Sequence, residues 1–216
     1  MTYADLVHAA GTRHLEIFGA FHPQPDDGLP ETVRTLVLLG PAEPGFWPHV
    51  RFEPEFLDQA PDPMDRWSRR VIGTWACDLG AKAYFPFSGP PYHPFIGWAL
   101  RSGRAWASAV GMLVHDRAGL MISHRGAIGL PQMINVPGPP PALPCDACQQ
   151  PCLTACLVDA LSAIAYDTDA CHGHLNTVEG SDCLTQGCAA RRICPVSQSY
   201  GRMPAQSAFH MRSFHP

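Results

Sequence analysis

The sequence predicts a mixed α/β (α+β) fold, in which a central sheet with flanking helices is followed by a small cysteine-rich module. Segments typical of helices and strands alternate along the first 135 residues, as in folds that pack helices on a sheet. Five of the nine residues at 136–144 are proline, which excludes helix and sheet and predicts an extended linker. Eight of the nine cysteines follow this segment, between Cys145 and Cys194.

Length and composition fit one ordinary domain or two small ones. The chain has 216 residues, of which 46% are hydrophobic and 16% are charged, and this excludes wholesale disorder. We expect an α/β region at 1–135, the linker at 136–144, the cysteine-rich module at 145–200 and a C-terminal tail at 201–216. Phe209 and Phe214 are the residues expected to pack this tail against the rest of the chain.

Charge and hydropathy bear on the partners and the compartment. The net charge is −4 and no basic run is present, so we expect no nucleic acid partner. The N-terminal residues lack a secretory signal, and the longest apolar stretch, 105–114, is too short to cross a bilayer. The sequence therefore predicts a cytoplasmic protein with no membrane partner, whose thiols stay reduced.

The clearest element of the first region is a helix that begins after Asp62. Asp62 suits the N-cap, Pro63 suits the first helical position, and Gly80 ends the pattern. Apolar residues at spacings of three and four predict one buried face, made of Met64, Trp67, Val71, Trp75 and Leu79. Further helices are predicted at 3–10 (capped by Thr2), 96–101 and 111–117, and strands at 15–21, 35–39, 81–85 and 127–130.

The cysteines are spaced closely enough for several thiolates to converge on one small body. An iron–sulfur cluster takes four such ligands, so eight cysteines make two sets. In bacterial two-cluster ferredoxins, three closely spaced cysteines bind one cluster and the fourth of the run crosses to the other. The same logic assigns one [4Fe-4S] cluster to Cys145, Cys148, Cys152 and Cys194, and a second to Cys156, Cys171, Cys183 and Cys188.

Other uses of these cysteines stay open at this stage. A single cluster with spare thiols would fit the irregular spacing that follows Cys183. A zinc site usually has two C-x2-C pairs, and only Cys145 and Cys148 show this spacing. Disulfides are disfavoured in a reducing compartment. Cys77 lies apart, on the predicted helix after Asp62, and we interpret it as an ordinary structural residue.

The cysteine-rich segments resemble the ferredoxin module of the epoxyqueuosine reductases and the related reductive dehalogenases, which depend on cobalamin. The similar segments are CDACQQPCLTACLVDAL from Cys145, DACHGHLNTVEG around Cys171 and GCAARRICPV around Cys188. The family has a further cysteine where this chain has Ala190 or Arg191, and the candidate replacement is Cys183. The resemblance implies a ferredoxin-like two-cluster module that passes electrons to a bound corrinoid.

Two upstream stretches extend the resemblance into the first region. HDRAGLMISHRGAIGL, residues 115–130, is similar to a segment that helps enclose cobalamin in those reductases. PPYHPFIGWALRSG, residues 90–103, resembles a segment of the cobalamin-trafficking chaperone. The resemblance implies a nitroreductase-like sheet with flanking helices. The catalytic aspartate of the reductases has no counterpart between Ser102 and Val114, so we do not expect their tRNA chemistry.

These stretches supply the candidate cofactor-binding residues. The side chains that would contact a flat macrocycle or a flavin are Tyr92, His93, Trp98, His115, His124 and Arg125. The alternative interpretation is an aromatic loop packed on a proline scaffold, with solvated residues at helix ends. His172 and His174, beside Cys171, are interpreted as supporting or surface groups, and Arg191 would place positive charge near a cluster.

The sequence as a whole predicts an iron–sulfur redox protein. Electrons from a redox partner protein would pass through both clusters to a corrinoid, as in a cobalamin-dependent reductase or a corrinoid-reducing factor; whether the chain is itself an oxidoreductase stays open. The alternatives are a ferredoxin-type electron carrier or docking subunit without an organic cofactor, and a zinc-stabilised interaction module. No Gly-rich phosphate loop and no G-x-S-x-G motif occurs, so Rossmann-type NAD binding, ATP hydrolysis and serine hydrolase chemistry are not predicted.

Overall fold

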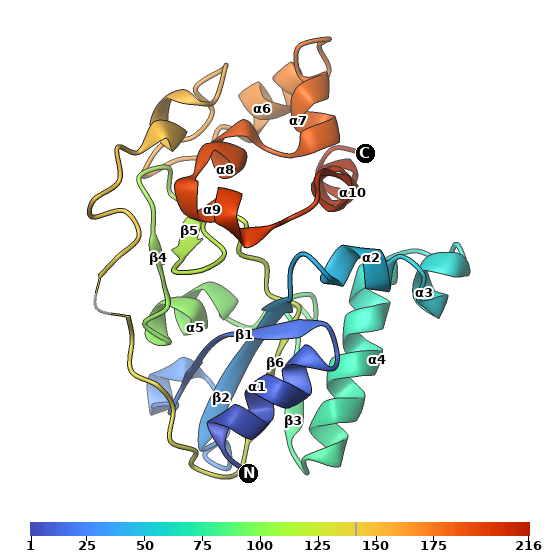
Figure 1. Ribbon diagram of the computed structural model, residues 1–216, viewed down its shortest axis with the longest axis vertical. Helices are drawn as coiled ribbons and strands as arrows, with labels where there is room; N and C mark the ends of the chain where they lie inside the picture. Colours follow the sequence, from blue (N-terminus) through green and yellow to red (C-terminus); the bar gives the residue numbers. More distant parts are fainter. Residues whose placement is uncertain (141) are drawn as a thin grey trace. The chain divides into compact units, whose positions relative to one another are not determined.

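The computed structural model describes residues 1–140 and 142–216; position 141, inside the predicted linker, lies outside the described residues. The chain is a mixed α/β fold with a small antiparallel sheet and several helices (Figure 1). It divides into two compact units. Unit 1 comprises Met1–Arg104 and Ser123–Pro139, and unit 2 comprises Ala105–Ile122 and Pro140–Pro216.

This division differs from the boundaries expected from the sequence. Residues 105–122 were expected within the region 1–135, but they group with the cysteine-rich part of the chain. The physical reason is the packing of their side chains, because Val110, Val114 and Leu120 share one hydrophobic core with Cys152 and Cys194. The proline-rich segment is therefore not the single crossing point between the units, since the chain also crosses near residues 104 and 123.

The centre of unit 1 is a four-stranded sheet. Its strands lie in the order β1 (Leu15–Phe21), β2 (Thr35–Pro41), β6 (Gly126–Leu130) and β3 (Lys82–Tyr84). Every residue of β2 and β6 is buried, so both faces of the central strands are covered. Such continuous apolar strands are typical of parallel sheets, but here each neighbouring pair is antiparallel. The four strands predicted in this region are confirmed.

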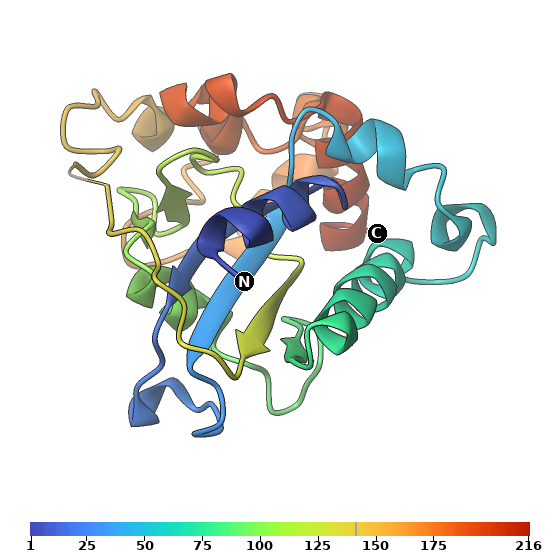
Figure 2. The same cartoon turned by 60° about the horizontal axis from the view of Figure 1, so that its bottom comes forward.

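Two helices of unit 1 contact opposite ends of the strand order. α1 (Tyr3–Gly11) contacts β1, and α4 (Pro63–Asp78) contacts β3 and β6 (Figure 2). The Thr2 cap of α1 is confirmed, since the Asp5 amide donates to Thr2 Oγ1 at 3.2 Å and the Thr2 amide donates to Asp5 Oδ2 at 2.7 Å. The remaining helical segments are η1 (Pro25–Asp27), α2 (Phe46–Val50), α3 (Pro54–Leu57) and α5 (Phe95–Arg101).

The helix predicted after Asp62 is α4, with one difference at its start. Asp62 occupies the N-cap, but its φ of 53° is left-handed and its side chain makes no capping hydrogen bond. The buried face includes Met64, Trp67 and Trp75 as predicted, together with Ile72. Pro63 in the first turn supplies the helical φ in advance, so α4 begins at the expected residue without help from the Asp62 carboxylate.

Unit 2 combines a short hairpin with small helices. β4 (Ala105–Ala107) pairs with β5 (Leu113–His115). The helix predicted at 111–117 is therefore wrong: Gly111 has a φ of 73°, and the residues after it extend along β4 instead of coiling. The helical segments of unit 2 are η2 (Pro151–Thr154), α6 (Thr168–Leu175), α7 (Ser181–Gln186), α8 (Ala189–Ile193), α9 (Pro195–Tyr200) and α10 (Pro204–Phe214).

The predicted C-terminal tail contains α10. This helix packs against α7, and the ring of Phe214 at its end stacks on Tyr166, with centroids 6.1 Å apart. Phe214 thus anchors this end of the chain as expected. Within the described parts of the chain, no helix has the length and apolar character needed to cross a membrane.

Candidate functional site

A cavity of about 500 Å³ in unit 2 brings four of the cysteines together. Cys145, Cys148, Cys152 and Cys194 all contribute to its wall. Apolar side chains of the hairpin region, Val114 and Leu120, line the same space. Three thiols from one short segment and a fourth from far along the chain therefore face a shared, mainly apolar volume.

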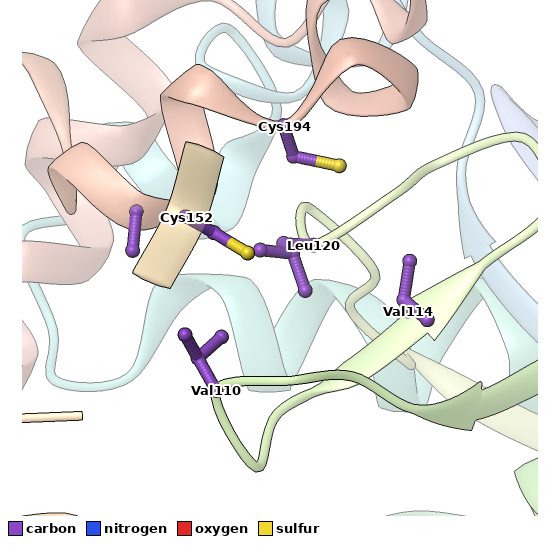
Figure 3. Close-up of a cluster of buried hydrophobic side chains, with 6 residues drawn as sticks. Val110, Val114, Leu120, Cys152 and Cys194 are labelled. Atoms are coloured by element: carbon purple, nitrogen blue, oxygen red, sulfur yellow. The ribbon is translucent and has the colours of Figure 1, made fainter. Parts of the chain in front are cut away.

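Two of these cysteines are part of the hydrophobic core. Cys152 and Cys194 are 7% and 8% exposed and pack with Val110, Val114 and Leu120. Figure 3 shows the Cys152 side chain pointing toward Leu120, with Cys194 coming from a separate segment of the chain. The core of unit 2 is thus built around sulfur atoms as well as methyl groups.

Turns and helix starts in the local backbone place these cysteines at the cavity. Cys152 lies on η2, which starts at Pro151 after Gln150 turns the chain with a left-handed φ of 52°. The amide of Gln150 donates to the sulfur of Cys148 at 3.3 Å. Cys194 is extended, with φ −60° and ψ 123°, and it forms the N-cap of α9 just before Pro195. Turns and proline-started helices, rather than one long element, bring the sulfur atoms toward the cavity.

The four thiols influence one another electrostatically. Burial raises the pKa of Cys145, and the neighbouring thiols of Cys148, Cys152 and Cys194 raise it further. Burial also raises the pKa of Cys152, with Cys194 and Cys148 adding to the effect. All four cysteines line the same cavity, so their thiols share one environment.

The remaining site cysteines form a second neighbourhood in unit 2. Burial raises the pKa of Cys171, with Cys188 and Cys156 adding to the effect. Burial likewise raises the pKa of Cys183, and the charge of Cys188 acts in the same direction. The sulfur of Cys156 accepts a hydrogen bond from the Ala160 amide at 3.3 Å. Cys156 and Cys188 thus act on Cys171, and Cys188 also acts on Cys183.

Tyr166, which the sequence analysis did not single out, contacts one of these cysteines, and the charge of Arg191 is influenced by another. The hydroxyl of Tyr166 donates to the sulfur of Cys171 at 3.2 Å. The guanidinium of Arg191 donates to the Leu120 carbonyl at 2.6 Å, and burial lowers the pKa of Arg191 while the Cys188 thiol acts to raise it. Sequence analysis missed Tyr166 because its contact depends on a hairpin that no motif reveals.

The geometry differs from that of a site for one metal ion. In the described residues no group of three or more His, Cys, Asp or Glu side chains could hold a single ion. The ligands of one ion must all lie about 2.0–2.3 Å from the same point. In a four-iron cluster each thiolate binds a different iron atom, so its four sulfurs stand around a larger body. The cavity of about 500 Å³ is lined by four thiols.

The structure distributes the candidate cofactor-binding residues over both units. Tyr92, His93, Trp98, His124 and Arg125 belong to unit 1, whereas His115 belongs to unit 2. His115 is fully buried, and its Nδ1 accepts hydrogen bonds from the amides of Arg117 and Ala118 at 3.2 Å. The imidazole of His115 therefore holds the turn that follows β5.

Several of the candidates in unit 1 make packing contacts. The ring of His93 stacks on Trp98 with centroids 5.6 Å apart, and Trp98 Nε1 donates to the Asp27 carbonyl at 2.9 Å. Arg125 Nη1 lies 3.5 Å from Asp65 Oδ1 on α4. Tyr92, in contrast, is 66% exposed. Among the candidates at residues 90–98, Tyr92 is thus the one that is mainly exposed to solvent.

His124 lies beside the ring of Phe95, with centroids 5.9 Å apart. Near the cysteines, His172 packs edge-on against Phe214 with centroids 4.6 Å apart, and His174 uses its carbonyl to accept from the Thr177 hydroxyl. Cys77 is an exposed residue of α4 in unit 1. These placements leave the eight clustered cysteines as the chemically distinctive group of unit 2.

Comparison with known proteins gave no match to this chain. No protein family model matches the chain, and neither a curated protein nor a solved structure matches it. The chemistry of the site therefore has to be argued from its own side chains.

Proposed function

We propose that the chain is an iron–sulfur redox protein whose eight clustered cysteines hold two [4Fe-4S] clusters. The observation that carries the proposal is the cavity of about 500 Å³ lined by Cys145, Cys148, Cys152 and Cys194. Thiolates are the ligands that iron–sulfur clusters use, in sets of four. The apolar wall around these thiols suits a cofactor that is held by sulfur and shielded from water.

The second set supports the same proposal. Cys171 is influenced electrostatically by Cys156 and Cys188, and Cys183 is influenced by Cys188. The two proposed sets alternate along the chain. Cys156, the last cysteine of the first run, is assigned to the second set, and Cys194, the last of the eight, is assigned to the first. This exchange is the arrangement of two-cluster ferredoxins, so we propose a ferredoxin-like module in unit 2.

The size of the unit 2 core gives an independent reason for a cofactor. Of the largest fully buried side chains in the described residues, Leu120 is the one in unit 2. Small modules with few large apolar residues usually need a metal or disulfides for stability. All eight cysteines of unit 2 are free thiols, which leaves them available as metal ligands.

The proposed activity is one-electron transfer. The eight thiolates would hold the clusters, and the bound clusters would supply one-electron redox chemistry between a reduced donor protein and an acceptor. The apolar residues around the first set would limit the access of water. In a compartment that keeps thiols reduced, such as the cytoplasm, free cysteines of this kind persist.

The second candidate adds a corrinoid as the acceptor, bound by a nitroreductase-like unit 1, so that the chain acts as a corrinoid-reducing oxidoreductase. The observation that favours it is a group of exposed apolar residues on α5 and in the loop before it: Ile96, Leu100 and Tyr92 are 67%, 44% and 66% exposed. Ile96 and Leu100 are four residues apart and so lie on one side of the helix. Exposed apolar surface of this kind marks a binding site more often than isolated residues do.

The decisive experiment is chemical analysis of the full chain purified without oxygen. We expect about eight iron and about eight sulfide per chain, as two four-iron clusters require. Cys152→Ser and Cys188→Ser should each lose about half of the iron, and they should lose different clusters by electron paramagnetic resonance. Cys77→Ser, the matched control on α4, should keep the full content. A chain that contains zinc or no metal would overturn the proposal.

The corrinoid candidate has its own test. Cob(II)alamin added to the anaerobic protein should bind with a shift of its visible spectrum, and a Tyr92→Ala/Ile96→Ala double variant should weaken that binding at least tenfold. Val7→Ala, at an exposed apolar residue of α1, is the control. If cob(II)alamin does not bind to protein with intact clusters, the chain is an electron carrier without a corrinoid.

A further inference from the structure

The hydrogen bond from Tyr166 to Cys171 differs in kind from the other contacts to cysteine sulfur described above. Cys148 and Cys156 accept from backbone amides, whose positions follow from the course of the chain. Cys171 accepts from a phenol hydroxyl at 3.2 Å. A side-chain donor has to be positioned by contacts of its own, and Tyr166 has such contacts at both its backbone and its ring.

The backbone of Tyr166 is fixed by a small hairpin. Tyr166 forms an antiparallel bridge with Leu161, and the Ser162 amide donates to the Ala165 carbonyl at 2.9 Å. The next residue, Asp167, is the N-cap of α6, and its side chain accepts from the Ala170 amide at 2.8 Å. Because Cys171 lies on α6, the hairpin and the helix that carries the thiol are joined rigidly at Asp167.

The ring of Tyr166 packs against a residue of the C-terminal helix, α10. Phe214 of α10 stacks on it with an interplanar angle of 14°, and the same phenylalanine packs edge-on against His172. α10 itself packs on α7. The phenol therefore reaches Cys171 from a ring that is clamped by the C-terminal helix.

Tyr166 is 46% exposed, and its hydroxyl is the donor in the bond to the Cys171 sulfur. A hydrogen bond from this hydroxyl stabilises negative charge on the sulfur.

We propose that Tyr166 is a positioning residue that raises the reduction potential of the cluster bound by Cys171. The inference rests on the proposed function, since it requires a cluster at this cysteine. Reduction adds one electron, taken from the donor, and increases the negative charge on the cluster and its sulfur ligands. A hydrogen bond to a ligand sulfur stabilises this more negative state, which is one of the known determinants of cluster potential.

The test is a redox titration of the anaerobic full-length protein, followed by electron paramagnetic resonance. Tyr166→Phe keeps the ring that stacks on Phe214 and removes only the hydroxyl. We expect it to lower the midpoint potential of one cluster, the one lost in Cys188→Ser, and to leave the other unchanged. Tyr3→Phe, which removes a phenol hydroxyl from α1 in unit 1, should change neither potential.

A second variant keeps the inference falsifiable if Tyr166→Phe fails to retain the cluster. Phe214→Leu leaves the hydroxyl in place but removes its clamp, and a smaller lowering of the same potential is expected. Full iron content with both potentials unchanged in the variant that retains its clusters would overturn the inference and leave the proposed function intact. Wild-type protein without iron and sulfide would overturn the proposed function itself.

Discussion

The Ser197 hydroxyl links two segments of unit 2 that are far apart in the sequence. Its Oγ accepts a hydrogen bond from the Leu120 amide at 2.9 Å, and the residue is 4% exposed. This bond links the segment after the β4–β5 hairpin to α9, the helix that follows Cys194. Water has little access to the Leu120 amide, so no solvent molecule replaces a missing partner.

We therefore predict that Ser197→Ala lowers the free energy of unfolding by about 1–3 kcal/mol, the cost of leaving a buried donor without a partner. The control is Ser199→Ala, which lies on the same helix but is exposed. Denaturant unfolding of the anaerobic protein measures both variants. Equal midpoints for the two would show that the Ser197 hydroxyl is not needed.

Gly119 adds a steric constraint at the same contact. A Cβ on this residue would lie 2.5 Å from the Ser197 backbone nitrogen, and its φ of 55° is left-handed. Both the close approach and the backbone conformation favour glycine here. Glycine at position 119 is thus required for packing inside unit 2.

At the scale of elements, two glycines of unit 1 predict opposite effects of the same substitution. A Cβ on Gly126 of β6 would meet Ile72 Cδ1 at 2.9 Å and the Tyr84 carbonyl at 3.1 Å, whereas a Cβ on Gly73 of α4 would meet nothing within 4 Å. We expect Gly126→Ala to destabilise unit 1 by about 1–3 kcal/mol through overpacking.

Gly73→Ala should stabilise by about 0.5–1 kcal/mol, because alanine loses less backbone entropy in a helix. Urea unfolding followed by tryptophan fluorescence measures the pair. A loss of stability in Gly73→Ala would contradict the open helix surface seen here.

The ion pair between α3 and α4 predicts that the free energy of unfolding depends on pH. Arg70 of α4 donates to the Glu55 carboxylate of α3 at 2.5 Å through Nε, and this hydrogen bond holds the pKa of Glu55 below its usual 4.5. The folded state therefore binds the proton less readily than the unfolded state. The stability from this pair is present above pH 4.5 and is lost as the pH falls through the lower, folded pKa.

Glu55→Gln should accordingly be less stable than the wild type at pH 7, and the difference should shrink as the pH falls below 4.5. Fluorescence-detected urea unfolding of unit 1 at several pH values gives this difference directly. A difference that grows on acidification would have the wrong sign for a depressed carboxyl pKa.

Elements that carry their own local signals were predictable from the sequence. The Thr2 cap defines α1, the spacing of Met64, Trp67 and Trp75 defines α4, and apolar runs define the sheet strands. The 111–117 segment failed because its apolar residues suit either period, and Gly111 adopts a left-handed φ that no local pattern announces. A Cβ there would lie 2.7 Å from the Ser162 carbonyl, a contact made far along the chain.

The residues of the candidate site also differ in whether the local sequence predicts their place. Cysteine spacing is local, so the sequence could predict that Cys145, Cys148 and Cys152 lie together at one cavity; that they bind a cluster stays a prediction. Tyr166, by contrast, depends on a hairpin and on the C-terminal helix, and His115 depends on which unit its strand joins. Side chains that act through long-range packing leave no trace in a single sequence.

At the scale of the whole molecule, the two units differ in what stabilises them. Unit 1 contains large fully buried side chains such as Trp67, Trp98 and Phe18, whereas the core of unit 2 is small and includes Cys152 and Cys194. Apolar burial scales with the area removed from water. Unit 1 therefore has a core of its own. Under the proposed function, unit 2 should depend on the proposed clusters, since metal binding in such modules supplies folding free energy.

Removal of the clusters should consequently unfold one unit and spare the other. We predict that a ferric oxidant with a chelator raises amide hydrogen exchange throughout α8 and α9 to the level of an unfolded chain, because these helices flank Cys194 and have little other core to hold them. The amides of β2 and β6, buried on both faces, should keep their protection. Chelator alone under anaerobic conditions is the control. Protection of α8 and α9 that survives measured loss of iron, or a sheet that opens together with them, would contradict this division of stability.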